Sequence, residues 1–155
     1  MAELLMKQKA LSIRENYEVY SSDELKYIIQ RRKLLAKKPV FDIFVEEGVV
    51  ATAEVTSTTA PVIYKIAFNG EDAGEVRYDE TPGVNKLVYE AKGIEVDGNS
   101  ILSEFTIKDK DKKIIGTIKK KIVSTKDTYD ISFQNEEDEL LFTMLGLLVD
   151  ETFHG

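Results

Sequence analysis

Apolar and polar positions alternate along most of the chain, and the alternation is grouped into a phrase that recurs. Each phrase opens on an aromatic residue followed two positions later by an aliphatic one. The five openings are Tyr17-Glu-Val19, Phe41-Asp-Ile43, Tyr64-Lys-Ile66, Phe105-Thr-Ile107 and Tyr129-Asp-Ile131. Their spacings are 24, 23, 41 and 24 residues. A period of two places these side chains on one face of a β-strand, so the phrases predict strands with one buried face.

The first four openings are each followed by a polar turn and a second alternating run, which predicts a β-hairpin. The second runs are residues 24–30, 49–55, 74–78 and 114–118. Turn signals stand at residues 46–48, 69–70, 97–99 and 108–113, and the Asn-Gly and Asp-Gly pairs among them supply positive φ angles. The long gap after Tyr64 holds a further hairpin, from residues 87–89 and 94–96. With an N-terminal run from Leu4 to Leu11, we expect eleven or twelve strands.

The last phrase changes period and predicts a helix. Asn135 can cap a helix whose first turn is Glu136–Glu139, where carboxylates favour the positive end of the helix dipole. From Leu140 to Val149 only Thr143 and Gly146 interrupt the apolar residues, so large side chains cover every side of the helix. Such a helix must be buried all round, and its apolar run is about half of the roughly 20 residues that span a bilayer.

These elements predict a mainly β fold, a closed antiparallel barrel of about twelve strands enclosing a hydrophobic C-terminal helix. Closure removes exposed strand edges, and small residues such as Gly116 would leave room for the helix. A propeller is disfavoured because each blade takes about 40 residues. The length of 155 residues fits a single domain, residues 1–155. Because the helix fills the lumen, we expect no ligand inside the barrel.

The composition limits the kinds of catalytic and metal-binding site that the chain can form. The chain has no cysteine, which excludes disulfides, thiolate metal ligands and cysteine nucleophiles. Its one histidine, His154, stands beside the C-terminus, where chains are usually poorly ordered. The N-terminus carries no secretory signal. We therefore expect a cytoplasmic protein that is not an enzyme and uses no cofactor. Acid–base chemistry by a carboxylate pair stays open as an alternative, although no pair can be placed.

The net charge of −7 is distributed in blocks. Residues 1–38 carry +4, residues 39–104 carry −9, residues 105–130 carry +4 and residues 131–155 carry −6. An acidic total argues against nucleic-acid binding, which needs many cations to neutralise phosphates. Two locally basic segments remain as possible anion-facing patches.

The first basic cluster comprises Arg31, Arg32, Lys33, Lys37 and Lys38, and the second comprises Lys119, Lys120 and Lys121. On a strand, Arg31 and Lys33 would share one side and Arg32 would face the other. A solvated strand end kept soluble by charge is the ordinary explanation of each cluster. An anion or headgroup site is the functional alternative.

Three further patterns have simple explanations. Asp109-x-Asp111 resembles the start of a calcium loop, but the sixth position is not glycine and the twelfth is Lys120. The acidic run at residues 136–139 suits a helix N-terminus better than a metal. The aromatic openings could stack on bases, but their position in the repeat indicates core. We expect no metal site.

Several stretches resemble the LURP-one-related family. They are residues 105–121, then Asp127-Thr-Tyr129-Asp-Ile131 with the Leu-rich helix, and at the N-terminus Met6-Lys-Gln-Lys9 with Tyr17-Glu-Val-Tyr20. The specific part of the match spans residues 94–150, whereas residues 34–90 depart from the family pattern and the family's tryptophans are missing. The family belongs with the Tubby C-terminal domains and the phospholipid scramblases, whose shared fold is a twelve-stranded barrel around a hydrophobic C-terminal helix.

This resemblance also implies a function. Tubby domains bind anionic phosphoinositide headgroups at their surface. The chain would then be a non-catalytic binding module, docking on an anionic lipid surface through basic residues and peripheral to the membrane. No Tubby headgroup residue matches a position here, and the scramblases' cysteine-rich segment is absent, so lipid scrambling is not implied. The alternative is a protein-interaction or structural module without lipid binding, using the acidic segment at residues 71–80 or an exposed strand.

Overall fold

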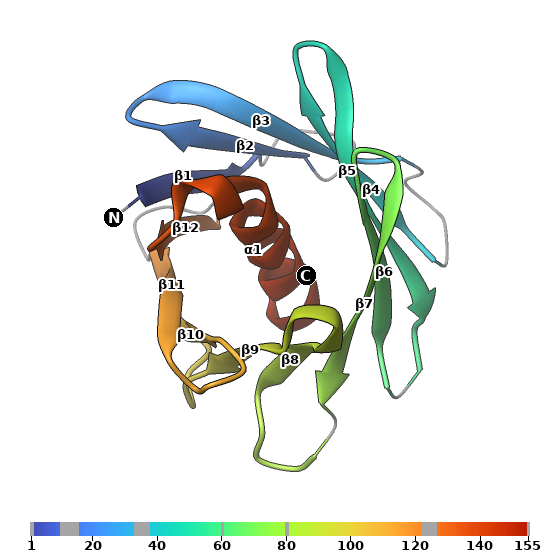
Figure 1. Ribbon diagram of the computed structural model, residues 1–155, viewed down its shortest axis with the longest axis vertical. Helices are drawn as coiled ribbons and strands as arrows, with labels where there is room; N and C mark the ends of the chain where they lie inside the picture. The colour runs from blue at the N-terminus through green and yellow to red at the C-terminus, as the bar shows by residue number, and fades with distance from the viewer. Residues whose placement is uncertain are drawn as a thin grey trace.

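The computed structural model describes residues 2–9, 16–32, 38–59, 61–79, 81–121 and 127–154. Its twelve described strands form one closed antiparallel barrel, in which each strand pairs with its neighbours in sequence and β1 closes on β12 (Figure 1). The strands are β1 (Ala2–Gln8), β2 (Asn16–Ser21), β3 (Glu24–Arg31), β4 (Val40–Val45), β5 (Gly48–Ser57), β6 (Ile63–Phe68), β7 (Glu71–Asp79), β8 (Lys86–Tyr89), β9 (Ile94–Gly98), β10 (Glu104–Lys108), β11 (Ile114–Lys121) and β12 (Thr128–Phe133).

The predicted barrel is therefore confirmed, and closure has a consequence for partners. Every described strand has a hydrogen-bonded neighbour on both sides. The expectation that an exposed strand pairs with a partner protein is wrong, because no described strand offers a free edge.

Alternation decides which side chains face the inside of the barrel. In β12, Tyr129, Ile131 and Phe133 are buried and the residues between them are half-buried. The five aromatic openings of the repeat all lie in the core, with Tyr64 the most exposed of them at 3%. Their interpretation as core residues is confirmed.

The interior is occupied by α1 (Glu139–Phe153), which follows a single 3-10 turn, η2 (Glu136–Asp138). Asn135 caps this turn and not the α-helix itself, since its side chain accepts a hydrogen bond from the amide of Glu137 at 3.2 Å. Every residue from Leu141 to Asp150 is buried, as a helix that is apolar all round requires. Within the described ranges, no helix is long and apolar enough to cross a bilayer.

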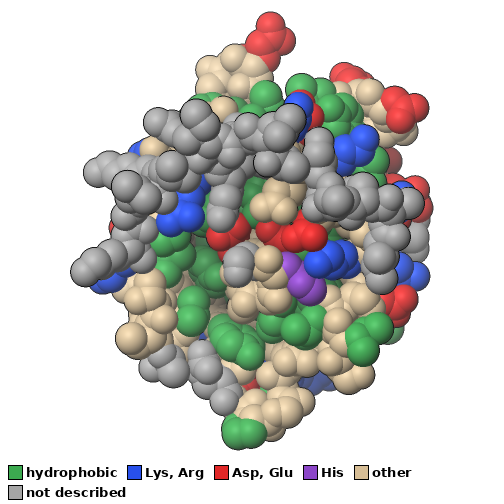
Figure 2. All heavy atoms as spheres, turned by 180° about the vertical axis from the view of Figure 1, so that it is seen from behind, with side chains coloured by type: hydrophobic (Ala, Val, Ile, Leu, Met, Phe, Trp, Pro, Cys, Tyr) green, Lys and Arg blue, Asp and Glu red, His purple; other side chains and the backbone are tan. Residues whose placement is uncertain are grey.

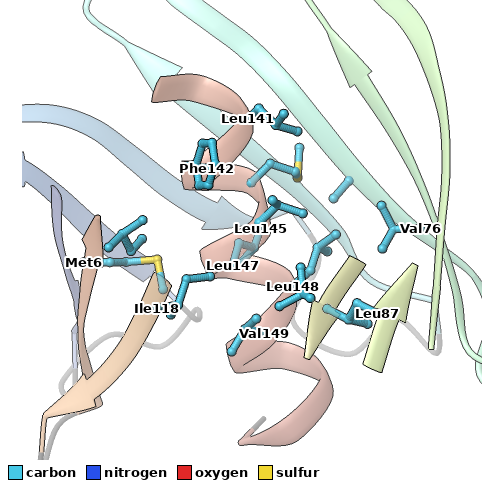
Figure 3. Packing of buried hydrophobic residues seen from close by; sticks show 14 of the residues in the cluster. Met6, Val76, Leu87, Ile118, Leu141, Phe142, Leu145, Leu147, Leu148 and Val149 are labelled. Atoms are coloured by element: carbon cyan, nitrogen blue, oxygen red, sulfur yellow. The ribbon is translucent and has the colours of Figure 1, made fainter. Parts of the chain in front are cut away.

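Side chains of α1 fill the space between opposite walls. Figure 3 shows them between Met6 and Ile118 on one side and Val76 and Leu87 on the other. Such interdigitation brings the core to the packing density of a protein interior.

Two glycines let α1 approach the wall formed by β1, β12 and β11. At Gly146 of the helix, a Cβ atom would lie 2.7 Å from Cδ1 of Ile131. At Gly116 on β11, a Cβ atom would lie 2.5 Å from Cε1 of Phe142. The ring of Phe142 stacks on Phe133 with 4.8 Å between centroids. The expected role of Gly116 in making room for the helix is confirmed.

The barrel has two rims. Because the strands are antiparallel, successive connections along the chain lie at one rim and then at the other. The helix-start rim, where α1 begins, has the connections 22–23, 46–47, 69–70, 90–93, 109–113 and 134–138; the fourth includes the 3-10 turn η1 (Glu90–Lys92). The helix-end rim, where α1 ends, has the connections 9–15, 32–39, 58–62, 80–85, 99–103 and 122–127.

Candidate functional site at the helix-end rim

The described members of both basic clusters lie at or near the helix-end rim. Arg31 ends β3 and Lys38 precedes β4, while Lys119 to Lys121 end β11. Three strands, β12, β1 and β2, separate β11 from β3. Four strand spacings of about 4.8 Å place the clusters roughly 19 Å apart along the wall. Lys33 and Lys37 lie outside the described residues.

In the first cluster, Arg32 is bound to a buried carboxylate. Its Nη2 donates to Oδ1 of Asp42 at 2.7 Å and its Nε to Oδ2 at 3.1 Å. Asp42 is 7% exposed, so the guanidinium neutralises a nearly buried charge, and this pairing raises the pKa of Arg32 further. Arg31 is half-buried, whereas Lys38 is exposed. Arg32 thus has a structural partner, and Lys38 faces solvent.

In the second cluster, strand alternation divides three consecutive lysines between two faces. Lys119 and Lys121 are exposed, whereas Lys120 is half-buried. The Lys120 ammonium lies 3.1 Å from Oδ1 of Asp127. Lys121 pairs with Asp130 at 3.3 Å, and Lys119 has no ion pair within the described part of the chain.

Lys119 and Lys121 line a groove of about 420 Å³ on the wall. The hydroxyl-bearing residues Thr117 and Ser132, which are directly paired across β11 and β12, line it too. Ammonium and hydroxyl donors suit an anion, whereas the carboxylates of Glu3 and Asp130, which also line the groove, balance the charge of the two lysines. Anion binding in this groove stays a prediction.

A buried polar cluster, which the sequence analysis does not predict, ties the end of α1 to the wall. Asp150, with 0% exposure, accepts hydrogen bonds from the hydroxyls of Tyr17 and Tyr129, and the Tyr17 hydroxyl also lies 2.7 Å from Oε2 of Glu151. Burial raises the pKa of Asp150 and the nearby Asp127 acts in the same direction, while the two hydroxyl donors oppose the shift.

The sequence carried only a weak signal for this cluster. In the sequence, Asp150 is the polar residue that ends the apolar run of residues 140–149. The signal is that Tyr17 and Tyr129 are tyrosines at a position where two of the phrases have phenylalanine, because a buried tyrosine hydroxyl needs a partner.

His154 is held in place by the rim. Its Nε2 lies 2.7 Å from the carbonyl oxygen of Leu102, and its Nδ1 lies 3.3 Å from the Lys120 ammonium. Since a carbonyl can only accept and an ammonium can only donate, these partners assign the ring proton to Nε2. The expectation of a poorly ordered C-terminus is wrong for this residue. Figure 2 views this rim and shows the histidine beside cationic and acidic side chains.

The connections of the two rims differ in charge. Those of the helix-start rim hold nine carboxylates and four lysines. The described residues of the helix-end connections hold three cations, Lys9, Arg32 and Lys38, and one carboxylate, Asp127. The carboxylates of the described connections are therefore concentrated at the helix-start rim.

The connections also differ in apolar content. Within the described connections, the large aliphatic residues Val62, Val84, Ile101 and Leu102 all belong to the helix-end rim, whereas the exposed Leu25, Val49 and Ile114 lie at the starts of strands beside the helix-start rim. Of these residues, Ile101 is 75% exposed. Connections are usually polar, so aliphatic residues concentrated at one end require an explanation.

Buried tyrosine hydroxyls predict a loss of stability in alkali. Burial raises the pKa of Tyr64 from 10.0 to about 12, and its hydroxyl lies 2.8 Å from Oγ1 of Thr152. Because the unfolded chain releases this proton first, the free energy of unfolding should fall as pH rises from 10 to 12, by about 1.4 kcal/mol per pH unit for this group. Denaturant unfolding between pH 9 and 11.5 should show a shallower decline for Tyr64→Phe. Ile43→Val is the control, because it destabilises the protein at a site that does not titrate, and its free energy of unfolding should fall with pH as steeply as that of the wild type. The same steepness in the wild type, Tyr64→Phe and Ile43→Val would contradict the prediction.

In the part of the chain that the structure describes, no group of three or more His, Asp or Glu side chains is placed to hold a metal ion. The exposed groups described at or near this rim include the ammonium groups of Lys38, Lys119 and Lys121 and one aliphatic side chain, Ile101.

Comparison with known proteins agrees with this architecture. A family model described as LURP-one-related matches residues 2–150. The chain is also similar to a protein described as "Uncharacterized protein YxjI" from Bacillus subtilis (strain 168), with 26% identity over 157 residues, covering 100% of this chain and 96% of that protein. No solved structure matches the chain. Since the family model spans nearly all of the barrel and its helix, the chain belongs to the LURP-one-related family.

Proposed function

We propose that this protein is a non-catalytic binding module that docks its helix-end rim on membranes containing anionic phospholipids. The observation that carries the proposal is that the exposed cations Lys38, Lys119 and Lys121 lie toward the same end of the barrel as Ile101, which at 75% is the most exposed of the large hydrophobic residues described. This combination suits a membrane interface, where lysines meet anionic headgroups and aliphatic side chains enter the acyl boundary. A purely solvated rim would need the charges but not the aliphatic residues.

The overall acidity of the protein does not oppose this docking mode. Six residues of strand at about 3.3 Å each place the two rims roughly 20 Å apart. That distance is about two Debye lengths at 0.1 M salt, so the carboxylates of the helix-start rim are largely screened from a surface at the other rim. The local charge of the docking rim then decides the sign of the interaction.

Different residues of the rim have different roles in this proposal. Lys38 and Lys119 are exposed cations for headgroups, Lys121 is an exposed cation that must exchange its surface ion pair with Asp130 for a headgroup, and Ile101 is an exposed side chain for insertion. Arg32 and Lys120 hold Asp42 and Asp127, so they stabilise the rim and contribute less to binding.

Flotation with vesicles tests the proposal. Wild-type protein should float with phosphatidylcholine vesicles containing 30% phosphatidylserine, and less so as salt is raised. Lys119→Glu/Lys121→Glu should lower the partition coefficient tenfold or more, since each cation near such a surface contributes about 1 kcal/mol. Ile101→Ser should lower it about fivefold through lost apolar burial.

The helix-start rim provides a matched control. Lys110→Glu/Lys113→Glu makes the same change in net charge in the connection at residues 109–113 of the opposite rim. This variant should float like the wild type. Equal loss in both double variants, or flotation that does not depend on anionic lipid, would contradict the proposal. Thermal unfolding by circular dichroism verifies that each variant is folded.

A further inference from the structure

A pocket of about 430 Å³ opens at the helix-start rim, on the side of the barrel away from the lysine groove. Its apolar lining comes from Phe68, Ala73, Tyr89, Ala91, Leu140 and Leu141. The expected filling of the lumen is found around the buried part of α1, whereas beside the first turn of α1 this pocket remains open. The volume lies within the roughly 300–1,000 Å³ of small-molecule sites.

Irregular backbone and small side chains keep this pocket open. Ile66 pairs with Gly74 and Ala67 with Asp72, so Ala73 is an extra, bulged residue of β7. Gly74 has a φ of +96°, and a Cβ atom there would lie 3.3 Å from Cβ of Ala91. Bulges often redirect side chains beside binding sites, and here the bulge lines the pocket with a methyl group. The Tyr89 hydroxyl donates to the carbonyl of Ala73 at 2.7 Å, which holds both the bulge and the ring in place.

Charged residues at the pocket indicate the sign of a ligand. Glu137 and Asp138 line it on the helix side and Lys92 lines it on the side of η1. The connections of the whole rim hold nine carboxylates against four lysines, so the surrounding field is negative. Aromatic rings together with carboxylates are the groups that recognise organic ammonium ions.

We propose that this pocket binds a small organic cation, an ammonium group carried on an apolar body of about the size of a phenyl ring. The half-buried ring of Phe68 contacts the apolar body and the charge, Tyr89, which is 2% exposed, forms part of the pocket wall, and Glu137 and Asp138 complement the charge. The Lys92 ammonium opposes binding. This site lies on the opposite rim from the proposed membrane surface and does not depend on it.

Amide NMR titration of the full chain with phenyltrimethylammonium tests the proposal. The shifts should concentrate at Ala73 and Ala91, and benzenesulfonate and benzyl alcohol, the anionic and neutral probes of similar size, should bind more weakly. Glu137→Gln should weaken binding of the cation about twofold to fivefold, and Lys92→Met should strengthen it by a similar factor. Glu46→Gln removes a carboxylate from the same rim outside the pocket lining and should leave binding unchanged.

Ala91→Phe tests the location of the site. Ala91 is exposed, so the larger side chain should fill the pocket without unfolding the barrel, and binding should be lost while thermal stability is kept. Several results would overturn the proposal: benzenesulfonate or benzyl alcohol binding as tightly as the cation, Lys92→Met leaving the affinity unchanged or lower, or a folded Ala91→Phe that still binds. Should Ala91→Phe fail to fold, the opposite responses of Glu137→Gln and Lys92→Met decide the question.

Discussion

Gly116→Val is expected to lower the free energy of unfolding by about 3 kcal/mol. The first added atom would lie 2.5 Å from Cε1 of Phe142 and 2.7 Å from the carbonyl oxygen of Ser132. The phenyl ring is confined between β11 and Phe133, and the carbonyl belongs to the backbone of β12, so neither can yield cheaply. Urea unfolding followed by circular dichroism measures the effect.

A neighbouring substitution separates this overlap from a general effect of valine. Thr117→Val places the same side chain on the next residue of β11, which is half-buried and not part of the core, and should cost less than about 1 kcal/mol. Phe142→Leu in the Gly116→Val background should recover part of the loss, because the clash with Ser132 remains. A Gly116→Val protein as stable as the wild type would show that the helix does not approach β11 so closely.

Replacing Tyr17 and Tyr129 together by phenylalanine is expected to cost about 3–5 kcal/mol at pH 8. The double variant leaves the carboxylate of Asp150 fully buried without either hydroxyl donor. Loss of the donors should raise the pKa of Asp150 further. The folded variant then holds a proton that the unfolded chain releases, so its stability is greatest in acid and falls as pH rises. The deficit relative to the wild type should thus be smaller at pH 5 than at pH 8.

Removing the carboxylate as well is the control for this prediction. Asp150→Leu in the Tyr17→Phe/Tyr129→Phe background removes the buried charge together with both hydroxyls, and should recover at least half of the lost stability. Denaturant unfolding at the two pH values measures all three proteins. A deficit that does not change with pH, or a triple variant no more stable than the double, would show that Asp150 does not depend on these hydroxyls.

Much of the fold can be predicted from the sequence, because side-chain alternation and helical periodicity are local properties. The phrase that opens at Tyr129 already predicts a strand whose alternate residues are buried, and residues 140–149 predict a helix with no polar face. A helix without a polar face must be buried on all sides, and in a chain made of strands a closed barrel around the helix provides that burial. The same reasoning predicts that a small residue such as Gly116 leaves room for the helix, and the close approach of Phe142 to Gly116 confirms it.

Local sequence patterns predict less about the groove and the pocket than about the fold. Alternation predicts that Lys120 faces away from Lys119 and Lys121, but not that it meets Asp127 and His154. The pocket beside Tyr89 depends on a one-residue bulge at Ala73, and no turn signal or periodicity marks that bulge in the sequence. Contacts of this kind depend on strand register.

By itself, the sequence determined the elements: alternating strands, a fully apolar helix and blocks of charge along the chain. Tertiary structure alone decided how those blocks are sorted in space, because antiparallel closure sends successive connections to opposite rims and collects nine carboxylates in the connections of the helix-start rim. It also decided the partners of Asp150, since Tyr17 is 133 residues away in sequence and meets the carboxylate only when the helix enters the barrel. Burial has a strong local signature in sequence, whereas pairing across a closed sheet depends on register and distance, and these are set only when the whole barrel forms.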